Sequence, residues 1–368
     1  MLPNYSILHK QDIFITEKYE PDIRRDELSF LSRSFERHFN ERPYLHHTCY
    51  LFLTKTTKER SRQQSNWNTL CRGFLVPKEI RDKETVERFM EAVGQFESIV
   101  NDSGLVRLER LTTEEITGTE NEPGIIERYL TLSADGTTML QDMQLNPDGM
   151  RIGDKRLCLH TLSDLDDLPG KVKTDGRYER LSTDRSDCRL SYAAPVGVML
   201  PCDHIYNQWI FIDDSNENLS RFEKAAKNMQ SLSRYSRSNQ INKEWLDEYL
   251  NEAHSNGLQS VRCHCNIIAW AENGHELRRV KNDVGSALAL MECTPHHNTT
   301  DLPALYWAGI PGNEADFPAE ETFYTFTGQA LCFFTAETCY RNSLSPFGIR
   351  MVDRLTGKPV FLDISDLP

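Results

Sequence analysis

The spacing of apolar residues changes repeatedly along the chain, which predicts a mixed α and β protein. Residues 82–100 carry apolar side chains at helical spacing, and Asp82 is placed to cap the start of this helix. The apolar stripe of this helix consists of Val86, Phe89, Met90, Val93, Phe96 and Val100. Residues 105–111 predict a short strand, and Thr112 with Glu115 gives the capping-box pattern that opens a second helix.

The second half of the chain alternates predicted strands and helices. Residues 204–212 predict a strand, and a long helix is expected from Leu219 to about residue 254. Apolar and polar residues then alternate over 261–267, as on a strand with one buried face, and residues 277–291 predict another helix. With the apolar segment 302–308 that follows, this order suggests a ferredoxin-like βαβαβ arrangement.

The pattern weakens between about residues 133 and 201 into short segments rich in Asp, Gly and Pro, so a domain boundary is expected near 190–201. We therefore predict an α+β fold with two mixed domains, 1–195 and 196–345, and no RecA-like motor. Residues 348–364 predict two strands around a turn at 356–359. We assign residues 346–368 to a strand hairpin that leads toward a further domain outside this sequence.

Composition limits the possible functions. The 368 residues include 42 Lys and Arg against 55 Asp and Glu, and this net charge of −13 disfavours a general binder of nucleic-acid backbones. The longest stretch without a charged residue, 322–336, contains several Thr and a Gln, so no transmembrane helix is predicted. The N-terminus lacks a secretory signal pattern, and the ten Cys include no C-x-x-C pair, so reduced intracellular thiols are expected.

The sequence contains no phosphate-binding loop of the form G-x-x-x-x-G-K-[ST], in which backbone amides face the phosphates and the Lys neutralises them. The Gly-Lys pairs at 170–171 and 357–358 lack both the earlier Gly and the following Ser or Thr. We therefore expect no nucleotide hydrolysis from these residues alone. No catalytic, cofactor-binding or metal-ligating residue is assigned.

One cluster offers the ligand types of a zinc site. It consists of Cys263, His264, Cys265, Cys293, His296 and His297. Neighbouring residues of a strand face opposite sides, so Cys263 and Cys265 would point away from His264. Free Cys is often buried, and this pattern favours core cysteines over a metal site. An H-E-x-x-H motif is also absent from the sequence.

Residues 202–204 hold the groups of a nucleophilic site, because Cys202 and His204 flank Asp203. Catalytic triads, however, are assembled from segments that are distant in the sequence. We therefore interpret Cys202 as a core residue at the start of a strand rather than as a nucleophile.

Two segments, 33–38 and 233–237, interleave basic and aromatic residues, as surfaces that bind single-stranded nucleic acid do. Solvated helix faces give the same pattern more often, and that interpretation is preferred here. The acidic run 164–167 is likewise interpreted as a solvated loop rather than as a site for a cation or a basic partner.

Eleven stretches match one protein family in order along nearly the whole chain. They are HKQD (9–12), SFLSRS (29–34), FNERPYL (39–45), DSG (102–104), RIGD (151–154), HIYNQ (204–208), SLS (231–233), WAGIPGN (307–313), ADFP (315–318), SLSP (343–346) and DRLTGKPV (353–360). On these stretches the chain resembles the N-terminal region of TraG-family proteins of conjugative transposons, the VirB/TraC-type ATPases of type IV secretion.

The resemblance implies a non-catalytic platform that docks a motor on the cytoplasmic side of an inner-membrane secretion complex during conjugative DNA transfer. In that family a phosphate-binding loop and a RecA-like motor follow the final hairpin, and a short segment precedes the residues that begin this chain. The implied partners are the inner-membrane secretion subunits and the protein's own ATPase domain, with self-association through the motor. The Pro311-Gly312-Asn313 turn lies near the motor junction in the wider class and is either a surface turn or a coupling element.

Two alternatives belong to other functional classes. The chain could contact single-stranded DNA within the transfer apparatus, which the acidic composition disfavours. It could instead be a thiol or metal enzyme built on Cys202 or on Cys263 and Cys265, which stoichiometric zinc or a reactive thiol would reveal.

Overall fold

The computed structural model describes residues 2–19, 30–61, 81–133, 141–146, 149–172, 176–232, 236–337, 343, 349–363 and 365. Its strands are β1 (Ser6–Glu17), β2 (Tyr44–Lys55), β3 (Met143–Asn146), β4 (Gly149–Ile152), β5 (Lys155–Leu162), β6 (His204–Ile212), β7 (Ser260–Ala271), β8 (His296–Asn298), β9 (Phe323–Phe326), β10 (Ile349–Val352) and β11 (Pro359–Leu362). Its α-helices are α1 (Phe30–Asn40), α2 (Lys58–Ser61), α4 (Lys83–Asp102), α5 (Thr113–Thr117), α6 (Ile125–Thr131), α7 (Ser215–Leu232), α8 (Arg237–Asn256), α9 (Gly274–Leu290), α10 (Leu302–Ala308) and α11 (Thr327–Leu331). Short 3-10 helices are η3 (Leu165–Asp167), η4 (Ala194–Val196), η5 (Glu314–Asp316) and η6 (Ala319–Glu321).

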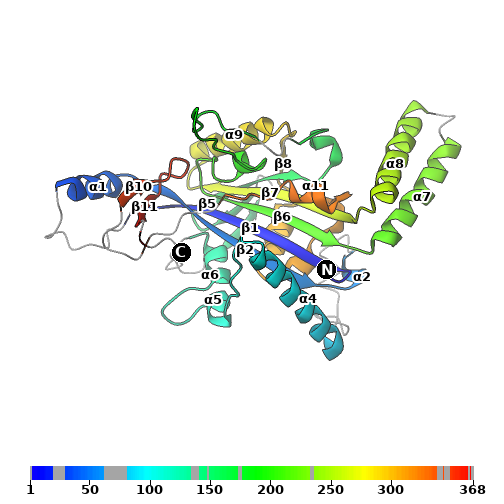
Figure 1. The fold of residues 1–368 in the computed structure, drawn as a ribbon, viewed down its shortest axis with the longest axis horizontal. Helices are drawn as coiled ribbons and strands as arrows, with labels where there is room; N and C mark the ends of the chain where they lie inside the picture. Colours follow the sequence, from blue (N-terminus) through cyan, green and yellow to red (C-terminus); the bar gives the residue numbers. More distant parts are fainter. Residues whose placement is uncertain are drawn as a thin grey trace.

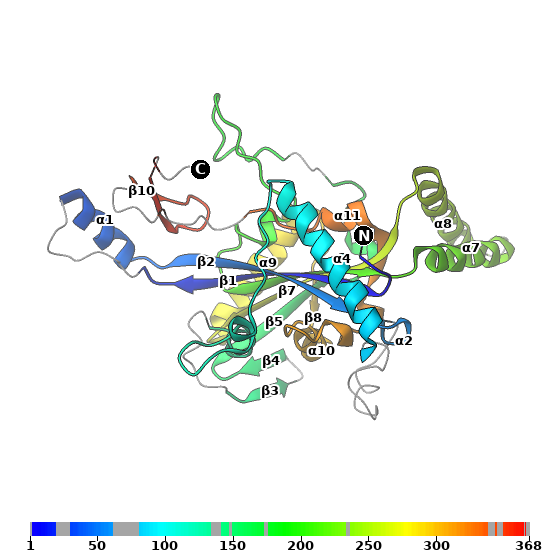
Figure 2. The same ribbon diagram turned by 60° about the horizontal axis from the view of Figure 1, so that its bottom comes forward.

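One large sheet organises the molecule (Figure 1). Its strands follow the order β2-β1-β6-β7-β5-β4-β3, with β8 beside β5 and β9 beside β7. Every pairing between the described strands is antiparallel. The strands β3 and β4 lie at one edge (Figure 2), and β10 and β11 form a separate hairpin where the sequence predicts it. The predicted α+β class is therefore confirmed.

The sheet draws strands from both sides of the boundary predicted near residue 195. Strand β1 pairs with β6, placing Ile13 opposite Ile205, and β5 pairs with β7, placing Leu159 opposite Ile268. Residues 193–200, where the apolar pattern weakens, include η4 and contribute several fully buried side chains to the core. The segments 1–195 and 196–345 therefore contribute to a common sheet.

The ferredoxin-like arrangement is not confirmed. A βαβ crossover joins parallel strands, whereas α7 and α8 connect β6 with β7, which pair antiparallel as neighbours. The apolar segment 302–308 forms α10. Its residues Leu302, Leu305 and Tyr306 recur at helical spacing and are buried, which explains the helix.

The two faces of the sheet bury different parts of the chain. The face that carries Leu8 packs against α9 and the η4 segment, and we call it the α9 face. The face that carries Ile7 and Ile13 packs against α6 and α10, and we call it the α10 face. Successive residues of a strand point to opposite faces, so the even residues of β1 lie on the α9 face and the odd ones on the α10 face.

Helices α7 and α8 form an antiparallel hairpin that extends away from the sheet (Figure 1). The sequence predicts one long helix from Leu219 to about residue 254, but two helices occupy this range. They pack through a small apolar cluster of Leu219, Ala226, Leu250, Ala253 and Phe326. Phe326 belongs to β9, so this cluster joins the hairpin to one strand of the sheet and is distinct from the two clusters that pack on the sheet faces.

Helix α4 begins after Asp82, whose side chain accepts a hydrogen bond from the Thr85 amide, as predicted. The helix crosses in front of the sheet in Figure 2, but none of its residues is buried. Its apolar stripe is therefore only partly covered. The segment 105–111 is not a strand; Leu105 is 88% exposed, and the Asn101 side chain bonds the backbone of Leu108 in place of a strand partner.

Among the described helices, none is long and apolar enough to cross a membrane.

Truncating a buried side chain of the α7–α8 hairpin should lower the local stability of the hairpin without unfolding the sheet. Leu250 is buried in the hairpin cluster, so Leu250→Ala is expected to cost about 2–4 kcal/mol of local stability. Hydrogen exchange should show this loss of protection in α7 and α8, with the amides of β6 and β7 unchanged. Trp245→Ala, at a position 59% exposed on the same helix, serves as the control and should change little. Equal protection of α8 in both variants would contradict this packing.

Candidate functional site

The middle of β1 is polar although β1 is an interior strand, paired with β2 on one side and with β6 on the other. His9, Gln11 and Asp12 have no exposed surface, and neither do Asn207 and Gln208 on the neighbouring strand β6. Burying polar groups without partners costs several kcal/mol each. These residues therefore require hydrogen bonds within the protein, and the two faces of the sheet supply them separately.

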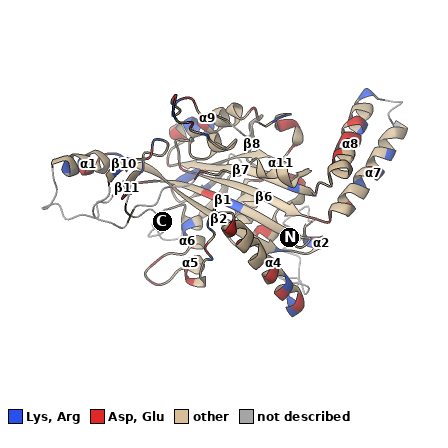
Figure 3. Cartoon of the chain, viewed as in Figure 1, with Lys and Arg blue, Asp and Glu red and all other residues tan. Residues whose placement is uncertain are grey.

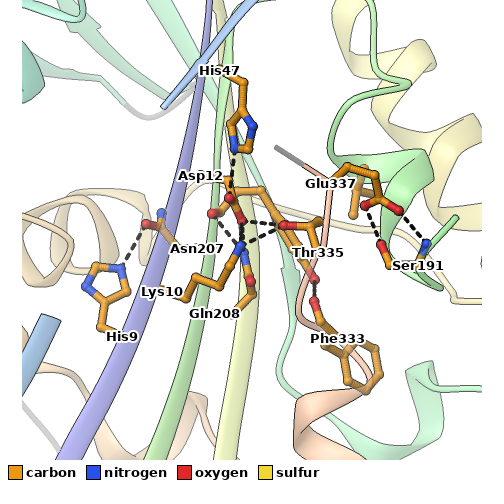
Figure 4. A network of polar contacts seen from close by, with 12 residues as sticks. His9, Lys10, Asp12, His47, Ser191, Asn207, Gln208, Phe333, Thr335 and Glu337 are labelled. Carbon is orange, nitrogen blue, oxygen red and sulfur yellow. Dashed lines mark hydrogen bonds and ion pairs between the residues drawn. The ribbon is translucent and has the colours of Figure 1, made fainter. Parts of the chain in front are cut away.

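On the α9 face, the Asp12 carboxylate is the centre of a network (Figure 4). His47 Nε2 on β2 donates to Asp12 Oδ1 over 2.9 Å. Asp12 Oδ2 accepts from Gln208 Nε2 at 3.1 Å, from Thr335 Oγ1 at 2.7 Å and from the Lys10 ammonium. The carboxylate thus accepts from four side chains, which come from β1, β2, β6 and the segment after α11.

This environment keeps Asp12 ionised. Burial by itself would raise the pKa of the carboxyl, but the Lys10 charge and the His47 hydrogen bond together outweigh burial and hold the pKa well below its ordinary value. The network therefore contains a permanent buried anion matched by a cation. With its lone pairs occupied by donors and no solvent contact, this carboxylate is suited to joining segments rather than to acid–base catalysis.

The same network fixes the segment after α11 to the sheet. Lys10 Nζ donates to Thr335 Oγ1 at 2.7 Å, and Tyr206 Oη donates to the Phe333 carbonyl at 2.9 Å. Glu337 accepts from the backbone amide and the hydroxyl of Ser191 at 2.5 and 2.6 Å. Residues 333–337 are therefore held to both the sheet and the segment that precedes η4 (Figure 4).

A second network lies on the α10 face. His9 Nε2 and Gln11 Nε2 both donate to Asn207 Oδ1 at 3.0 Å, and Gln11 also donates to the Gly309 carbonyl at 3.0 Å. The Glu314 carboxylate is fully buried, accepts from Thr54 Oγ1 at 2.8 Å and lies 3.6 Å from His9 Nδ1. These contacts attach residues 309–314, which include the Pro311-Gly312-Asn313 turn, to β1 and β2.

The turn itself has defined contacts. The Gly312 amide donates to Glu314 Oε1 at 3.1 Å, and Gly312 has φ of +88°, which disfavours any residue with a side chain there. Asn313 Nδ2 donates to the Trp307 carbonyl at 2.9 Å. The buried Glu314 therefore ties the turn to the sheet below it.

The Cys and His residues considered as zinc ligands are divided between the two faces. Cys263 and Cys265 lie in the core on the α9 face. His264 points to the α10 face, where its Nδ1 lies 2.5 Å from the Glu321 carbonyl. His296 instead bonds the Asp167 carboxylate at 2.6 Å. Within the described residues no group of three or more His, Cys, Asp or Glu could hold a metal ion.

The Cys202, Asp203 and His204 triplet does not form a thiol–imidazole pair in this geometry. His204 Nδ1 lies 2.8 Å from the Cys202 carbonyl oxygen, and Nε2 lies 3.1 Å from the Val196 carbonyl. Burial raises the pKa of the Cys202 thiol, and burial also lowers the pKa of His204 to about 4. Both shifts oppose formation of a thiolate–imidazolium pair.

The charged segments singled out in the sequence also find internal partners. On α1, Phe35 lies under the Arg350 guanidinium at 5.2 Å and against Phe39 at a ring distance of 4.5 Å. In the acidic run, Asp164 caps η3 and Asp167 is buried beside His296. Of the second basic segment, residues 233–235 lie outside the described residues.

Sequence reasoning did not identify the Asp12 network as a site. Its one local signal is the polar run 9–12 between the apolar pairs Ile7–Leu8 and Ile13–Phe14, which is unusual for a strand with neighbours on both sides.

Comparison with protein-family models gives no match to this chain, and comparison with curated proteins finds no significant match either.

Removing the Asp12 charge should strongly destabilise the fold. Asp12→Asn keeps the shape of the side chain but leaves the Lys10 ammonium, which is 12% exposed, without its counter-charge. We therefore expect the free energy of unfolding, measured in urea, to fall by about 3–5 kcal/mol. Because the pKa of Asp12 is lowered on folding, this contribution should be complete above about pH 3.9, the ordinary Asp value, and should shrink below it.

The matched control is Asp102→Asn, at an exposed position at the end of α4. Its effect should stay within about 0.5 kcal/mol. Equal stability of the two variants at pH 7 would contradict a structural role for the Asp12 network.

Proposed function

We propose that this chain is the N-terminal, pre-motor region of a TraG-family conjugation ATPase. In this proposal it docks the motor to the inner-membrane type IV secretion complex at the cytoplasmic side and performs no chemistry itself. The proposal requires a RecA-like motor outside these 368 residues. The observation that supports it best is that the stretches that carry the family resemblance pack against one another in the fold.

The central contacts involve four of those stretches. Residues 10–12 on β1 pair with residues 206–208 on β6, with Gln11 opposite Asn207 and Asp12 opposite Tyr206. Residues 307–313 cover the α10 face of this strand pair through the Gln11 bond to Gly309, and Ala315 and Phe317 pack in the same cluster as Ile205. The stretches are far apart in sequence, so their assembly into one buried centre is what a shared fold would require.

A second pair of stretches also meets. The Leu45 amide, at the end of stretch 39–45, donates to the Thr356 carbonyl at 3.1 Å, and Thr356 lies in stretch 353–360. The β10–β11 hairpin is therefore attached beside the start of β2. In the proposal this contact links the platform to the segment that leads toward the motor.

Helix α4 offers a surface on which a partner could dock. Along its apolar stripe, Val86 is 42% and Met90 is 50% exposed, and no member of the stripe is buried. Exposed apolar surface of this kind is typical of protein–protein contacts. We propose that an inner-membrane secretion subunit covers this stripe.

The surface charge does not favour the alternative of a DNA-contacting module. Lys, Arg, Asp and Glu are interspersed along α7 and α8 (Figure 3), and Lys243 lies 3.5 Å from Asp247. A nucleic-acid surface would concentrate positive charge on one face.

The docking proposal can be tested by photo-crosslinking in donor cells that carry the conjugation machinery, using the full-length protein. A photo-reactive amino acid at Met90 should capture an inner-membrane secretion subunit, identified by mass spectrometry. The same amino acid at Glu248, an exposed position on α8, should not. The double variant Val86→Asp with Met90→Asp should lower both capture and DNA transfer at least tenfold, because a charged stripe cannot be buried against an apolar partner.

Ile99→Asp is the matched control for that variant, since Ile99 is 68% exposed and lies across the helix from Met90. It should leave capture and transfer unchanged, and all variants should unfold at the wild-type temperature. Failure of the Met90 probe to capture any secretion subunit, or capture of DNA alone, would contradict the proposal.

A further inference from the structure

A small pocket opens on the α10 face between α6 and the strands β1 and β2, which lie beside one another (Figure 1). Its volume is about 70 Å³, several times the roughly 10–15 Å³ that a single water needs. The apolar part of its wall consists of Ile13, Ile15, Ile125, Leu132, Ile205 and Trp270. This lining suits a short hydrocarbon chain.

Two hydrogen-bond donors in the wall of this pocket have no acceptor among the described residues. Arg128 Nε is buried without a hydrogen bond, and no ion pair or side-chain hydrogen bond links the Arg128 guanidinium to a described residue. The indole N–H of Trp270 is also buried without an acceptor, and Trp270 is only 4% exposed. Unsatisfied buried donors are costly, so an acceptor brought by a ligand would stabilise the Arg128 guanidinium.

The remaining polar groups of the pocket wall limit the charge that a bound ligand can carry. Glu17 is already engaged, because it accepts from Tyr44 Oη at 2.8 Å and lies 3.6 Å from His46 Nδ1. Its negative charge on the same wall disfavours a dianion such as phosphate. Arg128 lies near Tyr50 and His46: burial raises the pKa of Tyr50, and the Arg128 charge partly offsets that rise. Among the described residues, the pocket thus combines the Arg128 guanidinium, which has no ion-pair partner, with an apolar floor.

We propose that this pocket binds a short-chain organic carboxylate, with its two oxygens on the Arg128 guanidinium and its alkyl chain against the isoleucines and Trp270. A guanidinium presents donors in a fork that matches a carboxylate, and Glu17 repels a monoanion less than it would repel a dianion. The alkyl chain accounts for the apolar wall, which a hydrated inorganic anion would leave unused. This ligand site is independent of the docking surface on α4.

Fluorine NMR of the protein labelled with 5-fluorotryptophan tests the proposal. The chain has five Trp, and Trp270→Phe identifies the resonance of the pocket. Butyrate, titrated at constant ionic strength, should shift this resonance saturably, with a dissociation constant in the millimolar range. Butyramide, which has the same shape without the charge, should not. The dipeptide N-acetyl-alanyl-valine tests in parallel whether a chain end can supply the same carboxylate.

The variant Arg128→Gln should weaken butyrate binding at least tenfold while the other Trp resonances keep their positions, which shows that the fold is intact. Arg107→Gln changes an arginine outside the pocket whose side chain is 83% exposed, and it should bind as the wild type does. The proposal is overturned if butyrate gives no saturable shift, if butyramide gives the same shift, or if Arg128→Gln binds butyrate as tightly as the wild type.

Discussion

The Asp12 carboxylate lies on an interior strand of the sheet without solvent contact, so neighbouring donors must balance its charge. Desolvation of such an ion costs several kcal/mol, and only correctly placed partners can offset that cost. Those partners are Lys10, His47, Gln208 and Thr335, and they come from β1, β2, β6 and the segment after α11. The requirement to satisfy one anion therefore specifies which strands are neighbours and which later segment closes over them.

On the opposite face of β1, buried polar side chains also bond the segments that cover the sheet, through a different set of groups. His9 and Gln11 direct their bonds to Asn207 and to the segment around Gly309, and the buried Glu314 attaches the turn after α10. Polar residues in a central strand thus fix the positions of the covering segments on both faces. Apolar packing alone specifies such positions less sharply, because many apolar arrangements are close in energy.

The sequence predicted what depends on local spacing. The pattern of residues 204–212 predicts a strand, and Asp82 is predicted to cap a helix; both predictions are confirmed. The helix at residues 302–308 was not predicted, because a short apolar segment is compatible with both a strand and a helix. The Asp12 network could not be predicted, since Thr335 lies 323 residues further along and no local pattern records that contact. The pocket beside α6 was missed for the same reason, because its walls come from five separate elements.

The measurement that tests this account most directly is a double-mutant cycle between Asp12 and Thr335, with Asp12→Asn and Thr335→Val measured by urea unfolding singly and together. If the Asp12 anion holds the segment after α11 to the sheet, the two changes should be coupled by about 1–2 kcal/mol. Additive effects, within about 0.5 kcal/mol, would show that the two residues act independently and would contradict the central role of this network.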